Sequence, residues 1–269
     1  DTFTIGKTGG TSHTVVGGTG TDTVNLTATT GLINVGSIDA EKINIDVDAG
    51  TSQTLSTSFG TGVDNVVITG GNSVSVFKTG TIVDQVKSVD ASAFLGQLDT
   101  TVADDKIDST ITLTGGVSTK DELNYKILAG STGTDNLTST GIEVLDLEIL
   151  ETSTINLANA TGIKTIDIDV ATGKTLTLDK LAGTELIKLT DAATGTGQVE
   201  AKLADASGSS DSVSFELKAT TDIAATTLLK TTDIETVNIK TSTAETISLA
   251  NAGAITDAEL YSTLKLTGD

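Results

Sequence analysis

The sequence lacks cysteine, methionine, tryptophan, proline and arginine, and it contains one histidine, His13. Without cysteine there is no disulfide scaffold, thiolate zinc site, iron–sulfur cluster or cysteine nucleophile. Without arginine there is no bidentate guanidinium group for phosphates or carboxylates. Acidic residues number 36 against 16 basic ones, and the net charge of −20 excludes a nucleic-acid partner because it repels a polyanion.

Long apolar segments are absent as well. No apolar run reaches the roughly 18 residues of a membrane helix, so we expect no transmembrane segment, and no signal peptide opens the chain. Because the first residue is Asp1, we expect a piece of a longer or processed protein whose targeting signal lies elsewhere. The chain is instead rich in threonine, glycine and aliphatic residues, which favour strands and tight turns. This composition predicts an all-β fold.

A repeat in the middle of the chain refines this prediction. Residues 141–147, 162–168 and 183–189 share a glycine, a charged residue and an apolar–polar–apolar alternation, about 21 residues apart. The short alternations 155–157 and 176–178 recur at the same interval. Two strands in each period predict a parallel β-solenoid, similar to a β-roll or β-helix, with two-strand coils of about 21 residues. Tandem β-sandwich domains are the alternative, because antiparallel strands alternate in the same way.

The alternation also predicts which side chains face the interior. The expected core residues are Ile43, Ile45, Val47, Leu145, Leu147, Ile166, Ile168 and Val170. The residues expected to face solvent are Asn44, Asp46, Asp48, Asp146, Asp167 and Asp169. The repeat is poor between residues 84 and 130. We therefore expect an N-terminal repeat region over 1–83, an irregular insertion or connection over 84–130 and a C-terminal solenoid over 131–269.

One motif indicates chemistry. Residues 17–25 fit the nonapeptide G-G-x-G-x-D-x-U-x at every fixed position, and residues 130–138 depart from it only at Ser131. Residues 59–67 lack the first glycine, and a degenerate copy surrounds Asp211. Glycines turn carbonyl oxygens inward and the carboxylate adds further oxygen ligands, a set that suits Ca²⁺. The candidate metal-binding residues are Gly18, Gly20, Asp22, Gly60, Gly62, Asp64, Ser131, Gly133, Asp135 and Asp211. The alternative is a plain turn closed by the aspartate.

These turns resemble the RTX repeats of type I secreted bacterial proteins. Scattered copies in a threonine-, glycine- and aspartate-rich chain resemble most the RTX-type surface-layer (S-layer) proteins of Gram-negative bacteria. That resemblance implies Ca²⁺ as cofactor, a cell-surface location and self-association into a two-dimensional array. It also implies anchoring to lipopolysaccharide through a region outside this chain.

Two other functions stay open from the sequence. One is a repeat segment of a secreted RTX adhesin, and the other is a polysaccharide-active enzyme built on a β-helix. The enzyme has few candidate residues, because arginine is absent, histidine occurs once and aromatic content is 3%. We therefore expect a structural protein with no catalytic residues.

Overall fold

A computed structural model describes most of the chain, in separate ranges of residues. These are residues 1–6, 13–28, 31–48, 53–59, 62–82, 86–102, 111–128, 130, 133–171, 173–189, 197–217, 228–231, 233–241, 255–256 and 263–268. Gly60 and Ser131 lie outside them. The described residues form strands and no helix, so this part of the chain has no helix that could cross a membrane.

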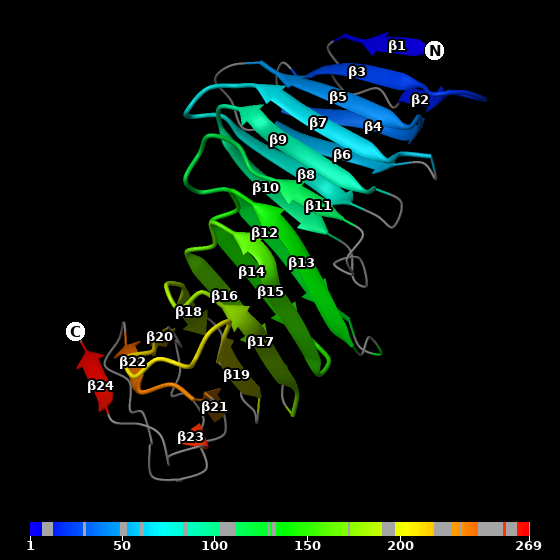
Figure 1. Ribbon diagram of the computed structural model, residues 1–269. Coiled ribbons are helices and arrows are strands. Elements are labelled where there is room, and N and C mark those ends of the chain that lie inside the picture. Colours follow the sequence, from blue (N-terminus) through cyan, green and yellow to red (C-terminus); the bar gives the residue numbers. More distant parts are fainter. Residues whose placement is uncertain are drawn as a thin grey trace. The chain divides into compact units, whose positions relative to one another are not determined.

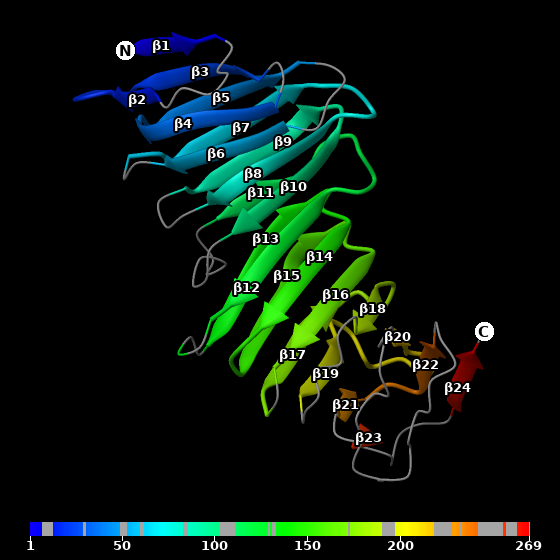
Figure 2. The same cartoon turned by 180° about the vertical axis from the view of Figure 1, so that it is seen from behind.

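The strands alternate between two sheets (Figures 1 and 2). The first sheet contains, in spatial order, β1 (Thr2–Ile5), β3 (Thr23–Ala28), β5 (Lys42–Val47), β7 (Asn65–Gly70), β9 (Ser88–Phe94), β11 (Thr112–Thr114), β13 (Thr134–Thr140), β15 (Ser153–Thr161), β17 (Thr175–Leu181), β19 (Gln198–Leu203), β21 (Leu228–Thr231) and β23 (Ile255–Thr256). The second contains β2 (His13–Val16), β4 (Gly31–Asp39), β6 (Gln53–Phe59), β8 (Val76–Ile82), β10 (Gln97–Val102), β12 (Glu122–Ile127), β14 (Val144–Ile149), β16 (Thr165–Val170), β18 (Leu186–Leu189), β20 (Ser212–Leu217), β22 (Thr236–Thr241) and β24 (Thr263–Gly268).

This order is that of a parallel β-solenoid, and it confirms the predicted fold class. Every strand pair with a described register is parallel, and each strand pairs with the strand two places further along the chain. Val144 pairs with Thr165 and Thr165 pairs with Leu186, at the predicted interval of 21 residues. Elsewhere the interval varies: Thr23 pairs with Lys42, 19 residues on, and Leu186 pairs with Ser214, 28 residues on. Most of the variation lies in the corners, because strand register is set by side-chain alternation. Register shifts within strand pairs such as β7–β9 and β17–β19 change the interval by one residue.

The core lies between the two sheets and is filled by aliphatic side chains. All eight residues predicted for the core are buried, including Ile43, Leu145 and Leu147 with no exposed surface. Their neighbours along the strands are exposed or half-buried, as predicted. Phe77 and Phe94 add an edge-to-face ring contact with centroids 6.3 Å apart.

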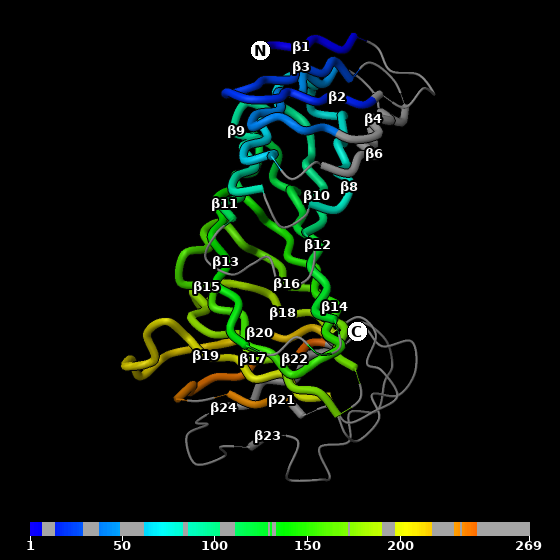
Figure 3. Tube along the Cα trace, turned by 90° about the vertical axis from the view of Figure 1, so that its right-hand side faces the viewer, coloured from blue at the N-terminus to red at the C-terminus, as the bar shows by residue number. Residues whose placement is uncertain are grey.

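Two compact units divide the described coils. Unit 1 comprises residues 1–124 and 138–143, and unit 2 comprises residues 125–137 and 144–269. Within unit 1, β9 and β11 lie on one side of the coils and β8 and β10 on the other (Figure 3). The region 84–130 contains β9 to β12, so two strands per coil continue through the stretch where the sequence repeat is poor.

Candidate calcium-binding turns

The turn with the complete nonapeptide follows β2 and leads into β3. Gly18 and Gly20 have φ of +92° and +121°, a backbone conformation that side chains with a Cβ rarely adopt. Gly17 serves a different purpose, because a Cβ there would lie 2.3 Å from Asp22 Oδ2. The turn therefore needs glycine at 18 and 20 for backbone angle, and at 17 for close approach of the Asp22 carboxylate.

Asp22 is buried, with 1% of its surface exposed. Its Oδ1 forms an ion pair of 2.5 Å with the terminal ammonium of Asp1. Its own N–H donates to Glu41 Oε2 at 2.6 Å. The carboxylates of Asp22 and Glu41 thus each bind a main-chain nitrogen of the preceding coil.

The register places three acidic residues at the same position of consecutive coils. Thr23 pairs with Lys42 and Lys42 with Asn65, so the residues before these, Asp22, Glu41 and Asp64, form one column. The N–H of Asp64 donates to the Glu41 carbonyl at 3.0 Å, and its Oδ1 forms an ion pair of 2.8 Å with Lys87 Nζ.

Asp39 also lies at this end of the coils. Its carbonyl accepts from Gly17 N–H at 2.8 Å, and its Oδ1 lies 2.6 Å from where a Cβ of Gly62 would be. The structure thus places Asp22 and Asp64, which are 42 positions apart in the sequence, in one column of the coils. Glu41 lies between them in this column, and Asp39 lies beside the same turns. The sequence signal for Glu41 was an acidic residue directly before a strand, as at Asp22.

The other two predicted aspartates lie in unit 2. Asp135 is half-buried, and its Oδ2 accepts from the hydroxyl of the buried Tyr125 at 3.2 Å. Gly133 in the same turn has φ of +155°. Asp211 donates its N–H to Glu235 Oε2 at 2.9 Å, which repeats the arrangement of Asp22 and Glu41. The Asp211 Oδ2 atom is buried, and it has no hydrogen-bond partner among the described residues.

A similar carboxylate arrangement, which the sequence reasoning did not single out, surrounds Asp121 in unit 1. Asp121 has no exposed surface, and its carboxylate accepts from the N–H of Leu98 at 2.8 Å and of Gly116 at 2.6 Å. Its own N–H donates to Glu143 Oε2 at 3.1 Å. Burial raises the pKa of Asp121 to about 6, although the two backbone N–H groups that bind its carboxylate oppose the rise.

Glu185 closes its own turn in a related way. Its carboxylate accepts from the N–H groups of Ala182, Gly183 and Thr184 at 2.8–3.0 Å. The carboxylates of acidic residues before strands therefore accept hydrogen bonds from backbone N–H groups at several corners. This is the role of a plain turn, the alternative to calcium binding that the sequence left open. Among the described residues, no group of three or more His, Asp or Glu side chains has the spacing of a metal site.

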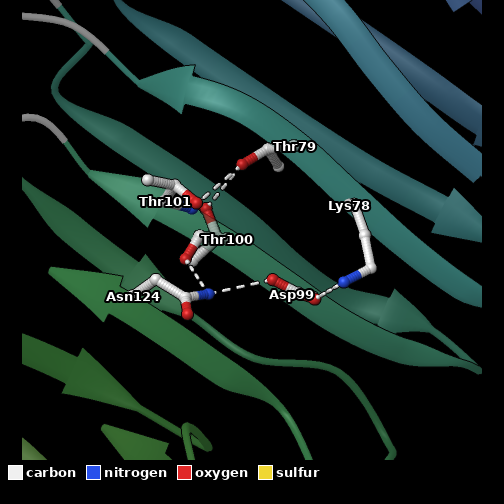
Figure 4. Close-up of polar contacts among 6 residues, drawn as sticks. All are labelled: Lys78, Thr79, Asp99, Thr100, Thr101 and Asn124. Carbon is white, nitrogen blue, oxygen red and sulfur yellow. Dashed lines mark hydrogen bonds and ion pairs between the residues drawn. The ribbon is translucent and has the colours of Figure 1, made fainter. Parts of the chain in front are cut away.

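The outer faces of the sheets carry polar ladders between coils. In unit 1, Lys78 pairs with Asp99, whose carboxylate also accepts from Asn124 Nδ2 at 2.9 Å (Figure 4). On the buried side of the same two strands, the hydroxyls of Thr79 and Thr100 lie 2.9 Å apart. Hydrogen bonding to Asp99 raises the pKa of Lys78 above its ordinary value.

In unit 2, one column on the second sheet carries both signs of charge. Asp146, Asp167, Lys188, Glu216 and Lys240 are consecutive register partners. The lysines separate most of the carboxylates, which reduces the repulsion expected when like charges lie on adjacent strands.

Comparison with known proteins identifies no family for this chain. The chain matches no protein-family model, no curated protein sequence and no solved structure.

Proposed function

We propose that this chain is a structural segment of a calcium-stabilised S-layer subunit on the surface of a Gram-negative bacterium. The observation that carries the proposal is the column formed by Asp22, Glu41 and Asp64 on three consecutive coils of unit 1. Parallel strands are about 4.8 Å apart, so carboxylates at one position of successive coils repel each other. A divalent cation that takes one or two of these carboxylates together with carbonyl oxygens of the turns would reduce this repulsion and stabilise the folded coils.

The rest of the proposal follows the sequence resemblance. The subunits associate with one another into a two-dimensional array, outside the cell. Anchoring to lipopolysaccharide uses a region outside this chain. A net charge of −20 supports folding that depends on cations, because self-repulsion resists compaction until it is neutralised.

We propose a structural role and no catalytic one. Two buried carboxylates, those of Asp121 and Glu185, accept hydrogen bonds from backbone N–H groups that hold corners together. The oxygens of such a carboxylate are already engaged in hydrogen bonds of the fold, which favours a structural role over general acid–base chemistry.

Calcium titration of the full chain after chelation tests the proposal. Circular dichroism would follow β-structure and light scattering would follow particle size, with magnesium as the control ion. We expect β-signal to rise with calcium and particle size to grow afterwards. Asp64→Asn should raise the calcium concentration at the midpoint, whereas Asp46→Asn, on the exposed outer face of β5, should leave it unchanged.

Each alternative gives a different result. A chain that is equally folded and monodisperse with and without calcium would overturn the S-layer proposal and favour a passive adhesin segment. Release of unsaturated product from uronate polymers would favour the β-helix enzyme. Equal effects of Asp64→Asn and Asp46→Asn would show that calcium acts on overall charge and not on the turns.

A further inference from the structure

Exposed large aliphatic side chains gather on three neighbouring corners of unit 1. Among the described residues, Val16, Val74, Leu95, Val117 and Leu128 are the exposed large hydrophobic side chains. Three of them, Val74 (69% exposed), Leu95 (50%) and Val117 (63%), line one groove of about 370 Å³. Single exposed aliphatic residues are ordinary, but a concave group of them is a feature of binding sites.

The groove is built from three consecutive corners of different length. Residues 71–75 connect β7 to β8, Leu95 and Gly96 connect β9 to β10, and residues 115–121 connect β11 to β12. The N–H of Leu95 donates to Gly70 O at 3.0 Å, and the N–H of Val117 donates to Phe94 O at 2.9 Å. A short corner between two longer ones leaves the hollow.

The walls of the groove are held by local contacts. Asn72 N–H donates to Ser75 Oγ at 3.0 Å, and Val74 N–H donates to Asn72 Oδ1 at 3.0 Å. At the short corner, a Cβ on Gly96 would lie 2.3 Å from Ser75 O, so these two corners are in close contact. The fully buried Phe94 packs beneath Gly71 and Gly96. Hydrogen bonds and packing within the corners therefore hold the shape of the groove.

The charge of the groove is opposite to that of the chain. Its polar lining residues are serines, Gln97, Thr119 and Lys120, and none is acidic. Lys120 is exposed, and no ion pair of its Nζ occurs among the described residues. The adjacent Asp121 carboxylate points inward to the N–H groups of Leu98 and Gly116. An ammonium group thus borders an aliphatic hollow in a protein of net charge −20.

We propose that this groove binds an aliphatic carboxylate, a short acyl chain that ends in a carboxylate group. The acyl chain lies on Val74, Leu95 and Val117, and the carboxylate pairs with Lys120 Nζ. A hollow of about 370 Å³ is at the small end of ligand sites, whereas a stable protein partner would need about 1,000 Å² of buried surface. The binding is independent of the proposed S-layer role and involves no bond making or breaking.

Amide NMR of the full chain with octanoate as the probe tests this site. We expect shifts confined to the three corners, with a dissociation constant in the millimolar range that suits a small open site. Octan-1-ol has the same chain without the charge and should bind about two- to fivefold more weakly, the effect of an exposed ion pair. Octylammonium should bind more weakly still.

Four variants separate the two parts of the site. Lys120→Gln should weaken octanoate about two- to fivefold and leave octanol unchanged. Val117→Thr should weaken both by about threefold, through loss of apolar contact. The matched controls are Lys42→Gln and Val16→Thr, an exposed lysine and an equally exposed valine of the same unit outside the groove. Circular dichroism shows whether each variant is folded.

Several outcomes would overturn the proposal. These are absence of shifts at the corners, equal affinity for octanoate and octylammonium, or equal loss in the Lys120→Gln and Lys42→Gln variants. Shifts at the groove that depend on protein concentration without octanoate would assign it to a second copy of the chain. Light scattering with calcium is measured separately, so failure of the groove and failure of assembly are distinguishable.

Discussion

Protonation of Asp121 should make unit 1 more stable in mild acid. The pKa of this buried carboxyl is about 6, against an ordinary value of 3.8, and the difference corresponds to about 3 kcal/mol of folding free energy. Because the folded-state pKa is the higher one, this stability is fully present below about pH 3.8. It is lost as the pH rises through about 6.

Asp121→Asn isolates this contribution, because the neutral amide does not titrate and all other carboxylates are common to both proteins. Relative to the variant, the wild type should lose about 3 kcal/mol of unfolding free energy between pH 4 and pH 7. Urea unfolding followed by circular dichroism measures the difference, and ¹³C NMR of the carboxyl carbon measures the pKa directly.

Asp90 provides a control of opposite sign. Hydrogen bonds from Ser92 hold the pKa of Asp90 below its ordinary value, so its contribution is present above about pH 3.8 and lost at lower pH. Relative to Asp90→Asn, the wild type should therefore gain stability as the pH rises. A pH-independent difference for Asp121→Asn, or a carboxyl pKa near 4, would refute the reasoning from burial.

Three further substitutions test packing and charge. Gly115→Ala places a Cβ 1.8 Å from a carbonyl oxygen of the neighbouring coil and should lower the free energy of unfolding by about 3 kcal/mol. The control Gly6→Ala meets no atom within 4 Å and should change the free energy of unfolding by less than about 1 kcal/mol. Leu147→Ala removes a core side chain with no exposed surface and should lower the free energy of unfolding, measured in urea, by about 2–5 kcal/mol. A loss below about 1 kcal/mol would contradict the described core. Lys188→Glu places a third carboxylate between two others and should lower the melting temperature most at low salt, whereas Lys42→Glu, between uncharged register partners, should not.

The strands could be predicted because their pattern is local. In the segment of Leu145 and Leu147, alternating burial is the cause of the alternating sequence, so core and register follow together. Corner length is not encoded in that alternation. The coil from Leu186 to Ser214 is seven residues longer than the one before it, and nothing in the flanking strands indicates this.

The candidate site was predictable only in part, for the same reason. Asp22 was visible because its nonapeptide is complete. Its neighbour in the column, Glu41, lies outside any nonapeptide; it directly precedes a strand, but only the register places it beside Asp22. The buried pair of Asp121 and Glu143 and the groove beside Lys120 depend on which corners lie together, which the sequence repeat does not specify in this region.

Within each unit, strands pair regularly while the corners differ in length, so the corners can change without changing the spacing of the strands. Each coil adds about 4.8 Å, so any two side chains placed in one column of the same unit have a spacing fixed by the number of coils between them. An added residue within a strand needs a bulge to keep the core face inward, as the register shift between β7 and β9 shows. The exposed corner 204–210 between β19 and β20, by contrast, already holds extra length. Peptides inserted at that corner would be displayed at a defined height along unit 2 without a change in strand pairing.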